Sequence, residues 1–216
     1  MIMPILTRSS RRVVVDIDTQ KHFFQPNSAV CVNDHRRVLA NVLRVVNWAQ
    51  ISHVPRLSTI QRLDESQFAP ADIGGEMGQL KVDYTVRGRW LNFTPSDRTD
   101  IHPDILNHYQ QVIFQKRCFN PFDEPKVDRM LSELFADEFV LIGTATEGAV
   151  KATAIGLLSR GRKVTILTDA VGSYNKTIGE LALRVLKERG AVLTETKAYL
   201  NSTHYEPLGW HNWNWR

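Results

Sequence analysis

The sequence predicts an α/β protein built as a three-layer α/β/α sandwich around a mostly parallel central sheet. The first observation is that apolar runs typical of buried strands alternate with stretches of helical periodicity. Such alternation builds βαβ units, whose strands are parallel and whose helices cover both faces of the sheet. The second observation is size, because 216 residues suit one domain. We therefore expect a single domain over residues 1–216.

The first elements form a strand–helix–strand unit. Residues 12–19 carry three consecutive valines followed by acidic residues, the pattern of a buried strand with a polar carboxyl end. Residues 34–50 begin with Asp34, a residue type favoured at helix N-caps, and continue with an apolar stripe at helical spacing. Residues 54–60 predict a second, short strand.

Residues 61–110 are less regular and rich in glycine and proline. We expect long loops around one short strand near Leu80–Tyr84. Long irregular segments inside compact domains are often functional. This irregular region is therefore expected to shape a ligand pocket.

Regular alternation returns from residue 111 to residue 196. We predict strands at 111–115, 139–143, 163–168 and 191–196, and helices at 126–136, 147–160 and 177–189. Gly161 and Gly190 follow the last two helices, as helix-ending glycines do. Residues 197–216 form a C-terminal tail with Trp210, Trp213 and Trp215. The alternatives for this tail are a disordered segment and a segment docked on the domain or in a subunit interface, and the large apolar surface of the tryptophans favours docking.

Composition and charge exclude several classes of protein. The hydrophobic content of 43% and charged content of 23% are those of a globular chain, not of a disordered or collagen-like one. No apolar run approaches the roughly 18–20 residues of a membrane span, and no signal-peptide pattern opens the chain. The net charge of +4 is spread along the chain rather than gathered beside aromatic residues. We expect a cytoplasmic protein that binds neither membrane nor nucleic acid.

Metal ions and other cofactors are not expected. Cys31 and Cys118 are too few for a disulfide framework or a zinc cluster. The histidines are scattered without ligand spacing, and no glycine-rich phosphate loop is present.

Three positions should meet where ligands bind in open α/β sheets, beyond the carboxyl ends of the strands. Asp18 ends the first strand, Lys116 follows the strand at 111–115, and residues 144–149 link a strand to the next helix. Asp16 falls on the same face of its strand as Asp18 by alternation, and we expect it to be structural.

These positions resemble the motifs of the isochorismatase-like hydrolase superfamily, which includes nicotinamidases and other cysteine amidases. The resemblance runs from about residue 12 to residue 196 and implies a Rossmann-like sandwich. The matching segments are Asp18-Thr-Gln20-Lys-His-Phe23 for the family's D-x-Q-x-x-F, Lys116-Arg-Cys-Phe-Asn120-Pro-Phe122 for its lysine motif, Gly143-Thr-Ala-Thr146-Glu147-Gly-Ala149-Val150-Lys-Ala-Thr153-Ala154 for its G-x-x-T-[D/N/E]-x-C-V-x-x-T-A, and Asp169-Ala170 for its D-A.

The resemblance also implies roles for single residues. Asp18 corresponds to the family's base and Lys116 to the lysine that supports its charge. The amides of Ala145 and Ala149 correspond to an oxyanion hole that follows a non-proline cis peptide, here Thr144–Ala145. Substrate-binding roles are expected for Gln20, Phe23 and Asn120.

The chain departs from the family at Ala149, where the nucleophilic cysteine is expected. Ala149 keeps the backbone N–H and lacks the sulfur. Removing the nucleophile of a cooperating catalytic unit costs about 10⁶-fold in rate in a well-studied case. Ordinary cysteine amidase chemistry is therefore not expected.

Several alternatives remain open from the sequence. The chain could hydrolyse a small amide, imide or vinyl ether without a thiol, as isochorismatases proper cleave a vinyl ether with an acidic aspartate. Cys118 or Glu147 could substitute for the missing group. The chain could instead be a pseudoenzyme that only binds a small molecule, or an engineered Cys-to-Ala variant of a cysteine amidase. Family amidases that bind a metal use a D-x-H motif, which is absent from 58–63. The expected partners are a small-molecule substrate and further copies of the chain in a homo-oligomer.

Overall fold

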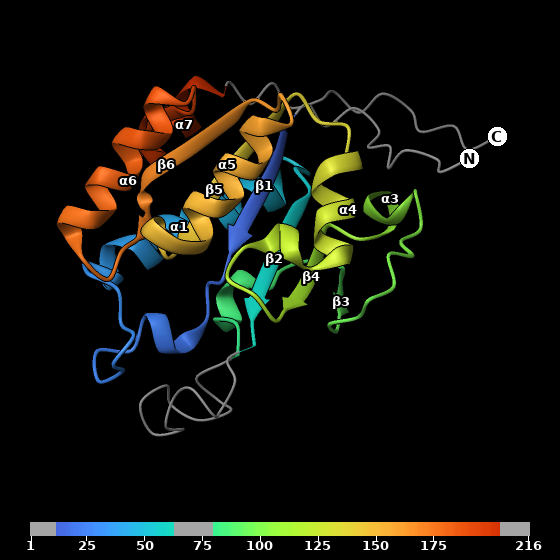
Figure 1. Ribbon diagram of the computed structural model, residues 1–216, viewed down its shortest axis with the longest axis horizontal. Coiled ribbons are helices and arrows are strands. Elements are labelled where there is room, and N and C mark those ends of the chain that lie inside the picture. Colours follow the sequence, from blue (N-terminus) through green and yellow to red (C-terminus); the bar gives the residue numbers. More distant parts are fainter. Residues whose placement is uncertain (1–11, 63–79, 204–216) are drawn as a thin grey trace.

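The computed structural model describes residues 12–62 and 80–203 (Figure 1). Most of the predicted tail, including its three tryptophans, lies outside these residues. Part of the irregular region, residues 63–79, lies outside them as well.

The centre of the structure is a sheet of seven parallel strands in the order β3-β4-β2-β1-β5-β6-β7. Strands β2, β3 and β4 lie on one side of β1, and strands β5, β6 and β7 lie on its other side. The strands are β1 (Arg12–Ile17), β2 (Arg56–Gln61), β3 (Trp90–Phe93), β4 (Gln111–Lys116), β5 (Glu138–Thr144), β6 (Val164–Gly172) and β7 (Val192–Thr194).

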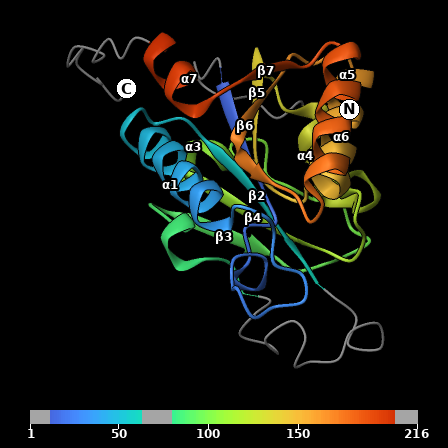
Figure 2. The ribbon, with the colours of Figure 1, turned by 90° about the vertical axis from the view of Figure 1, so that its left-hand side faces the viewer.

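Helices cover both faces of this sheet, as Figure 2 shows from the side. One face carries α1 (His35–Ile51) and α7 (Thr196–Ser202), and the other carries α4 (Pro125–Glu133), α5 (Lys151–Ser159) and α6 (Lys176–Glu188). The predicted three-layer α/β/α sandwich is confirmed. The short elements are α3 (Ile105–His108), η1 (Lys21–Phe23), η2 (Asp83–Thr85), η3 (Pro121–Asp123) and a π-helical turn, η4 (Thr146–Val150).

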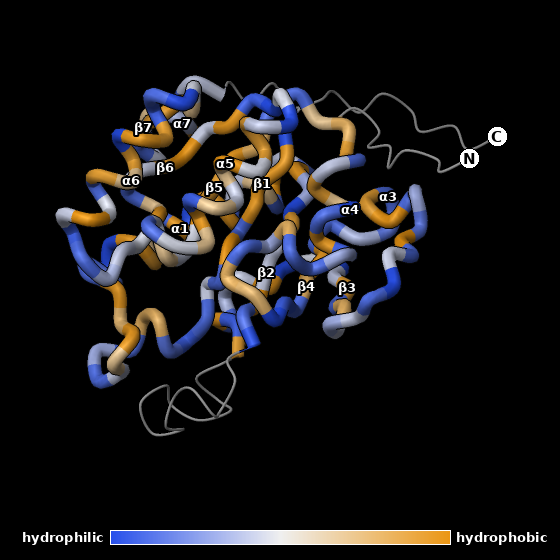
Figure 3. The backbone as a smooth tube through the Cα atoms, in the orientation of Figure 1, coloured by the Kyte–Doolittle hydropathy of each residue, from blue (hydrophilic) through white to orange (hydrophobic). Residues whose placement is uncertain are grey.

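The consecutive valines of β1 are explained by two separate apolar cores. Val13 and Val15 pack into the core under α4 and α5, whereas Val14 packs into the core under α1. Both faces of a central parallel strand are covered, so its sequence is continuously apolar. The tube in Figure 3 accordingly shows strand β1 and strand β5 as mostly hydrophobic segments in the middle of the molecule.

The predicted strand at Leu80–Tyr84 is wrong. Lys81 forms only an isolated antiparallel bridge with Gln20, and η2 follows directly. The strand of this region is β3, at the edge of the sheet, where only Leu91 and Phe93 are partly buried. Its apolar pattern is short because an edge strand with one exposed face buries few side chains, so the sequence signal was weak.

Two helices also differ from their predicted bounds. The helix predicted at 147–160 is divided into η4 and α5, because Gly148 has non-helical angles of φ −109° and ψ −111°. Residues 196–202 form α7. The predicted C-terminal tail had included residues 197–202 of this helix. Its Tyr199 is buried against the α1 face.

Glu138, at the start of β5, connects β5 to β6 and α7 through its carboxylate. It accepts hydrogen bonds from Thr165 of β6 and from Tyr199 Oη of α7 at 3.0 Å. Burial alone would raise the pKa of Glu138, but these hydrogen bonds and the charges of Lys163 and Arg12 outweigh it and lower the pKa. The charged form of Glu138 therefore stabilises the folded state.

We expect Glu138→Gln to flatten the loss of stability in acid. The side chain of a glutamate in the unfolded chain has a pKa of about 4.3. Because the folded pKa is lower, the stabilisation by Glu138 is complete above that pH and is lost as the pH falls through the folded pKa. Urea unfolding at a series of pH values from about 7 to about 3 measures this slope. The exposed Glu180→Gln on α6 is the control, and an unchanged slope in Glu138→Gln would contradict the prediction.

Candidate active site

Four neighbouring strands bring the predicted site residues to one edge of the sheet. Asp18 follows β1 directly, Lys116 ends β4, and Thr144 ends β5. Between β4 and β1 lies β2, which contributes Thr59 and Gln61. The strands that follow β1 in sequence are first added on one side of it, and from β5 onward they are added on its other side. The strand order therefore reverses between β1 and β5, and α/β proteins bind ligands at such switch points.

The centre of the site is a buried ion pair between Asp18 and Lys116. Lys116 Nζ lies 2.8 Å from Asp18 Oδ2, and the two side chains are 0% and 4% exposed. Thr59 Oγ1 donates to the other carboxylate oxygen, Oδ1, at 2.6 Å. A buried charge is tolerated only when it is paired and hydrogen-bonded, and this carboxylate meets both conditions.

The ammonium group of Lys116 is fully committed to the protein. Besides Asp18, it donates to Gln61 Oε1 and to the carbonyl oxygen of Cys118, the latter at 3.1 Å. An ammonium group has three protons, and these three acceptors use them. Lys116 therefore holds Asp18 in place and has no proton left for a ligand.

Gln20 acts on the ion pair through Gln61. Its side-chain Nε2 donates to the Gln61 carbonyl at 2.9 Å, and its Oε1 accepts from the Gln61 N–H at 2.8 Å. This double contact fixes the backbone from which Gln61 reaches Lys116. The predicted contact of Gln20 with substrate stays a prediction.

Asp16 and Asp18 point to opposite sides of the sheet, although alternation placed them on one face. Asp18 has a φ of 47°, so the chain turns as it leaves β1. Asp16 instead forms a fully buried ion pair with Lys81 at 2.7 Å and accepts from Ser58 at 3.1 Å. This second pair fastens the segment around Lys81 to the sheet, in keeping with the structural role expected for Asp16.

The segment with Ala145 and Ala149 lies directly beside Asp18. Thr144 Oγ1 donates to the Asp18 carbonyl at 2.8 Å, and the Thr144–Ala145 peptide is cis, as the family resemblance implies. Ala149 is 2% exposed, and its carbonyl oxygen accepts from Thr153 Oγ1 at 2.7 Å. The role of the Ala145 and Ala149 amides as an oxyanion hole stays a prediction.

Asn120 and Phe23 have local partners in the structure. Asn120 caps η3, with its Oδ1 accepting from the Phe122 N–H at 3.2 Å. The Phe23 ring is buried and lies 4.0 Å from the His22 ring and 6.0 Å from the Tyr174 ring. Contacts of Asn120 and Phe23 with substrate stay predictions.

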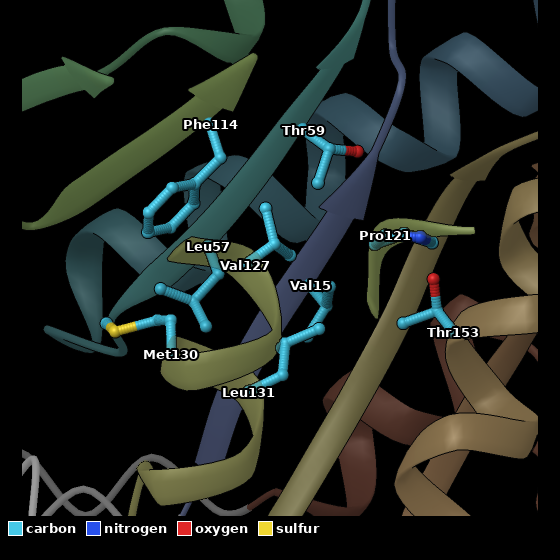
Figure 4. Close-up of a pocket in the computed structure, with 9 residues that line it drawn as sticks. All are labelled: Val15, Leu57, Thr59, Phe114, Pro121, Val127, Met130, Leu131 and Thr153. Atoms are coloured by element: carbon cyan, nitrogen blue, oxygen red, sulfur yellow. The ribbon is translucent and has the colours of Figure 1, made fainter. Parts of the chain in front are cut away.

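A small cavity lies between the sheet and α4, with Thr59 in its lining (Figure 4). Its volume is about 10 Å³, roughly the room that one water needs. The lining is apolar except for Thr59, which is bonded to Asp18, and Thr153, which is bonded to Ala149. This cavity is too small to hold a substrate. Its lining residues are Val15, Leu57, Thr59, Phe114, Pro121, Val127, Met130, Leu131 and Thr153.

Sequence reasoning missed three residues of the site: Thr59, Gln61 and Tyr174. Thr59 lies in the strand predicted at 54–60 and Gln61 directly follows that strand, and a spacing of two residues places them on one face. That spacing was the available signal for them. Tyr174 had no comparable signal, because it lies in a loop after β6.

Within residues 12–62 and 80–203, no three side chains of histidine, cysteine, aspartate or glutamate gather in a way that could hold a metal ion. Over the same ranges no helix is both long and apolar enough to cross a bilayer.

The fold and this site define a member of a known family of hydrolases. The chain belongs to the isochorismatase family, whose domain model, described as Isochorismatase domain, matches residues 12–198. No curated protein matches the chain.

Solved structures of the same fold include an isochorismatase-like hydrolase from Alkaliphilus metalliredigens, with a TM-score of 0.69 and 17% identity over 89% of this chain and 96% of that one. A nicotinamidase from Bacillus subtilis has a TM-score of 0.65 and 20% identity over 86% of this chain and 99% of that one. A ribonuclease from Caenorhabditis elegans has a TM-score of 0.62 and 21% identity over 90% of this chain and 82% of that one. At these identities the likeness concerns the fold alone.

Proposed function

We propose that the protein is a thiol-independent hydrolase of the isochorismatase family that acts on a small amide or imide. The observation that carries the proposal is the buried Asp18–Lys116 pair at the switch point of the sheet. Asp18 acts as the general base, and Lys116 holds its carboxylate in place.

The contacts of Asp18 leave room for a water nucleophile. Thr59 occupies one lone pair of Oδ1 and Lys116 one lone pair of Oδ2, and each carboxylate oxygen has two. A water held by a remaining lone pair could lose its proton to Asp18 while its oxygen bonds to the carbonyl carbon. Asp18 would then return that proton to the nitrogen as the C–N bond breaks, which releases the amine and a carboxylic acid. The resemblance places the family's sulfur at position 149, so the alanine leaves that space to the water.

The same contacts argue against the vinyl-ether chemistry of isochorismatases proper. That reaction needs Asp18 to carry a proton and to act as an acid. In the structure both oxygens of the Asp18 carboxylate accept hydrogen bonds instead, Oδ2 from Lys116 and Oδ1 from Thr59. Amide or imide hydrolysis with Asp18 as base is therefore the better-supported reaction.

The proposal includes a cytoplasmic homo-oligomer whose partner is a small molecule rather than nucleic acid. Cys31 and Cys118 are both free thiols, as is usual for proteins of a reducing compartment. Ile178 and Leu181 are more than half exposed on α6, and apolar side chains of this kind suit a contact between subunits.

Turnover of a panel of small amides and imides tests the proposed reaction. We expect Asp18→Asn to lower kcat/KM by about 10²–10⁴-fold, the usual contribution of a general base. Glu180→Gln makes the same chemical change on the exposed face of α6 and should leave turnover unchanged. Turnover that survives intact in Asp18→Asn would refute the role of Asp18.

A small-molecule binder without turnover is the second candidate, favoured by the single observation that residue 149 is alanine. It predicts that the present chain is inactive on the whole panel and that Ala149→Cys creates activity. The thiol-independent proposal predicts measurable turnover before any cysteine is introduced. The two proposals therefore differ in the activity of the unmodified chain.

A further inference from the structure

The loop after β6 runs along the segment that carries Ala149. Gly172 pairs in register with Thr144 at the end of β5, and Thr146 Oγ1 donates to the Gly172 carbonyl at 2.9 Å. Thr144 in turn is bonded to the backbone of Asp18. Tyr174, two residues beyond Gly172, is therefore held next to the candidate site.

The backbone of Tyr174 is fixed from two sides. Glu147 Oε1 accepts from the N–H of Tyr174 at 2.9 Å and from that of Asn175 at 3.3 Å. Asn33 Nδ2 donates to the Tyr174 carbonyl at 2.7 Å. The ring packs against Phe23, which belongs to the D-x-Q-x-x-F motif. Tyr174 is thus positioned by the same segments that build the site.

The phenol of Tyr174 is available as a hydrogen-bond donor. The residue is 40% exposed, and its hydroxyl has no hydrogen-bond partner among the residues that the structure describes. Burial raises the pKa of Tyr174, and the negative charges of Asp18 and Glu147 raise it further. The phenol therefore keeps its proton at neutral pH, whereas Lys116 has no proton to spare.

Glu147 supplies an acceptor on the same side of the site. Its Oε1 is used by the backbone of Tyr174 and Asn175, but its Oε2 is buried without a hydrogen-bond partner in the described part of the chain. A buried carboxylate oxygen without a donor is costly, so such an atom is expected to receive one from a ligand or a water. Glu147 lies two residues before Ala149, in the same π-helical turn.

We propose that Tyr174 and Glu147 form a recognition pair for the amide group of the substrate. The Tyr174 phenol donates to the carbonyl oxygen, and Glu147 Oε2 accepts from the adjacent N–H. Amides, imides and ureides present these two groups side by side, whereas a vinyl ether has no N–H. The inference rests on the proposed function and narrows its substrate class, and it assigns Glu147 to recognition rather than to the missing nucleophile.

Binding of matched probes tests the recognition pair without any turnover. Nicotinamide is compared with 3-acetylpyridine, and acetamide with acetone, so that a methyl group replaces the NH₂ in each pair. Affinities are measured by ligand-observed NMR. We expect each amide to bind about tenfold more tightly than its ketone, as the loss of one well-placed hydrogen bond implies.

Two variants distinguish the contribution of Tyr174 to binding from that of Glu147. Tyr174→Phe keeps the ring beside Phe23 and should weaken amide and ketone alike, because both have a carbonyl. Glu147→Gln keeps an oxygen for the N–H groups of Tyr174 and Asn175 but places an NH₂ at the Oε2 position. It should weaken only the amides and erase the preference. Tyr84→Phe and Glu180→Gln, at exposed positions, are the matched controls and should change neither affinity.

Three results would overturn the inference: the absence of amide preference in both probe pairs, unchanged affinities of amide and ketone in Glu147→Gln, or equal weakening of amide and ketone in that variant. The last result would mean that Glu147 only supports the loop. These outcomes are independent of the general-base test, because Asp18→Asn is read from turnover and the recognition pair from binding.

Discussion

Lys116→Met is expected to lower the free energy of unfolding by about 3–5 kcal/mol, because it leaves a buried carboxylate without its counter-ion. Methionine is similar in size to the lysine stem, so little packing is lost. Asp18 would keep only Thr59 as a side-chain partner, and Gln61 Oε1 would lose its donor. Urea unfolding followed by circular dichroism measures the change.

Two further variants test the cause of this loss. Asp18→Asn combined with Lys116→Met removes the buried charge altogether and should be more stable than Lys116→Met alone. Lys21→Met breaks a pair with Asp83, which is 76% exposed, and should cost no more than about 1 kcal/mol. A double variant no more stable than the single one would show that the charge is not the cause.

Gly143→Ala is expected to cost more than about 3 kcal/mol, because two separate effects add. Gly143 has a φ of 113°, a conformation that residues with a Cβ rarely adopt. A Cβ at this position would also lie 1.9 Å from the carbonyl oxygen of Ile17, a backbone atom of the neighbouring strand β1. The substitution would push β1 away from β5 immediately before Asp18.

Gly190→Ala is the matched control for this effect. Gly190 has a similar φ of 99°, but a Cβ there meets nothing within 4 Å. We expect a loss of about 1–2 kcal/mol from backbone conformation alone. The difference between the two alanine variants, measured by thermal and urea unfolding, isolates the clash with Ile17. Equal losses in both would contradict it.

The central strands could be predicted because their signals are local. Runs such as Val13–Val15 and Phe139–Gly143 are apolar on both faces, as a covered parallel strand requires. The meeting of Asp18 and Lys116 also followed from sequence, because carboxyl ends of parallel strands share one edge. Both predictions follow from rules that do not require knowledge of which residues pair between neighbouring strands.

The remaining site residues depend on register, which the sequence did not provide. Gln61 reaches Lys116 because β2 pairs with β4 so that these two residues stand opposite each other. Tyr174 reaches the site because β6 continues to Gly172, past a register shift between Leu141 and Gly143 in its partner β5. Pairing between distant strands sets both contacts, and no local pattern reveals it.

All three protons of the Lys116 ammonium group are donated to protein acceptors, which affects how the product of the proposed hydrolysis leaves the site. Asp18 and Lys116 neutralise each other, and Glu147 adds a negative charge in the η4 turn that carries Ala149. Hydrolysis of an uncharged amide in this site would create a carboxylate while the Lys116 ammonium group stays bound to protein acceptors. Like charges repel, so the acid formed is expected to leave quickly and to be a weak inhibitor compared with the amide.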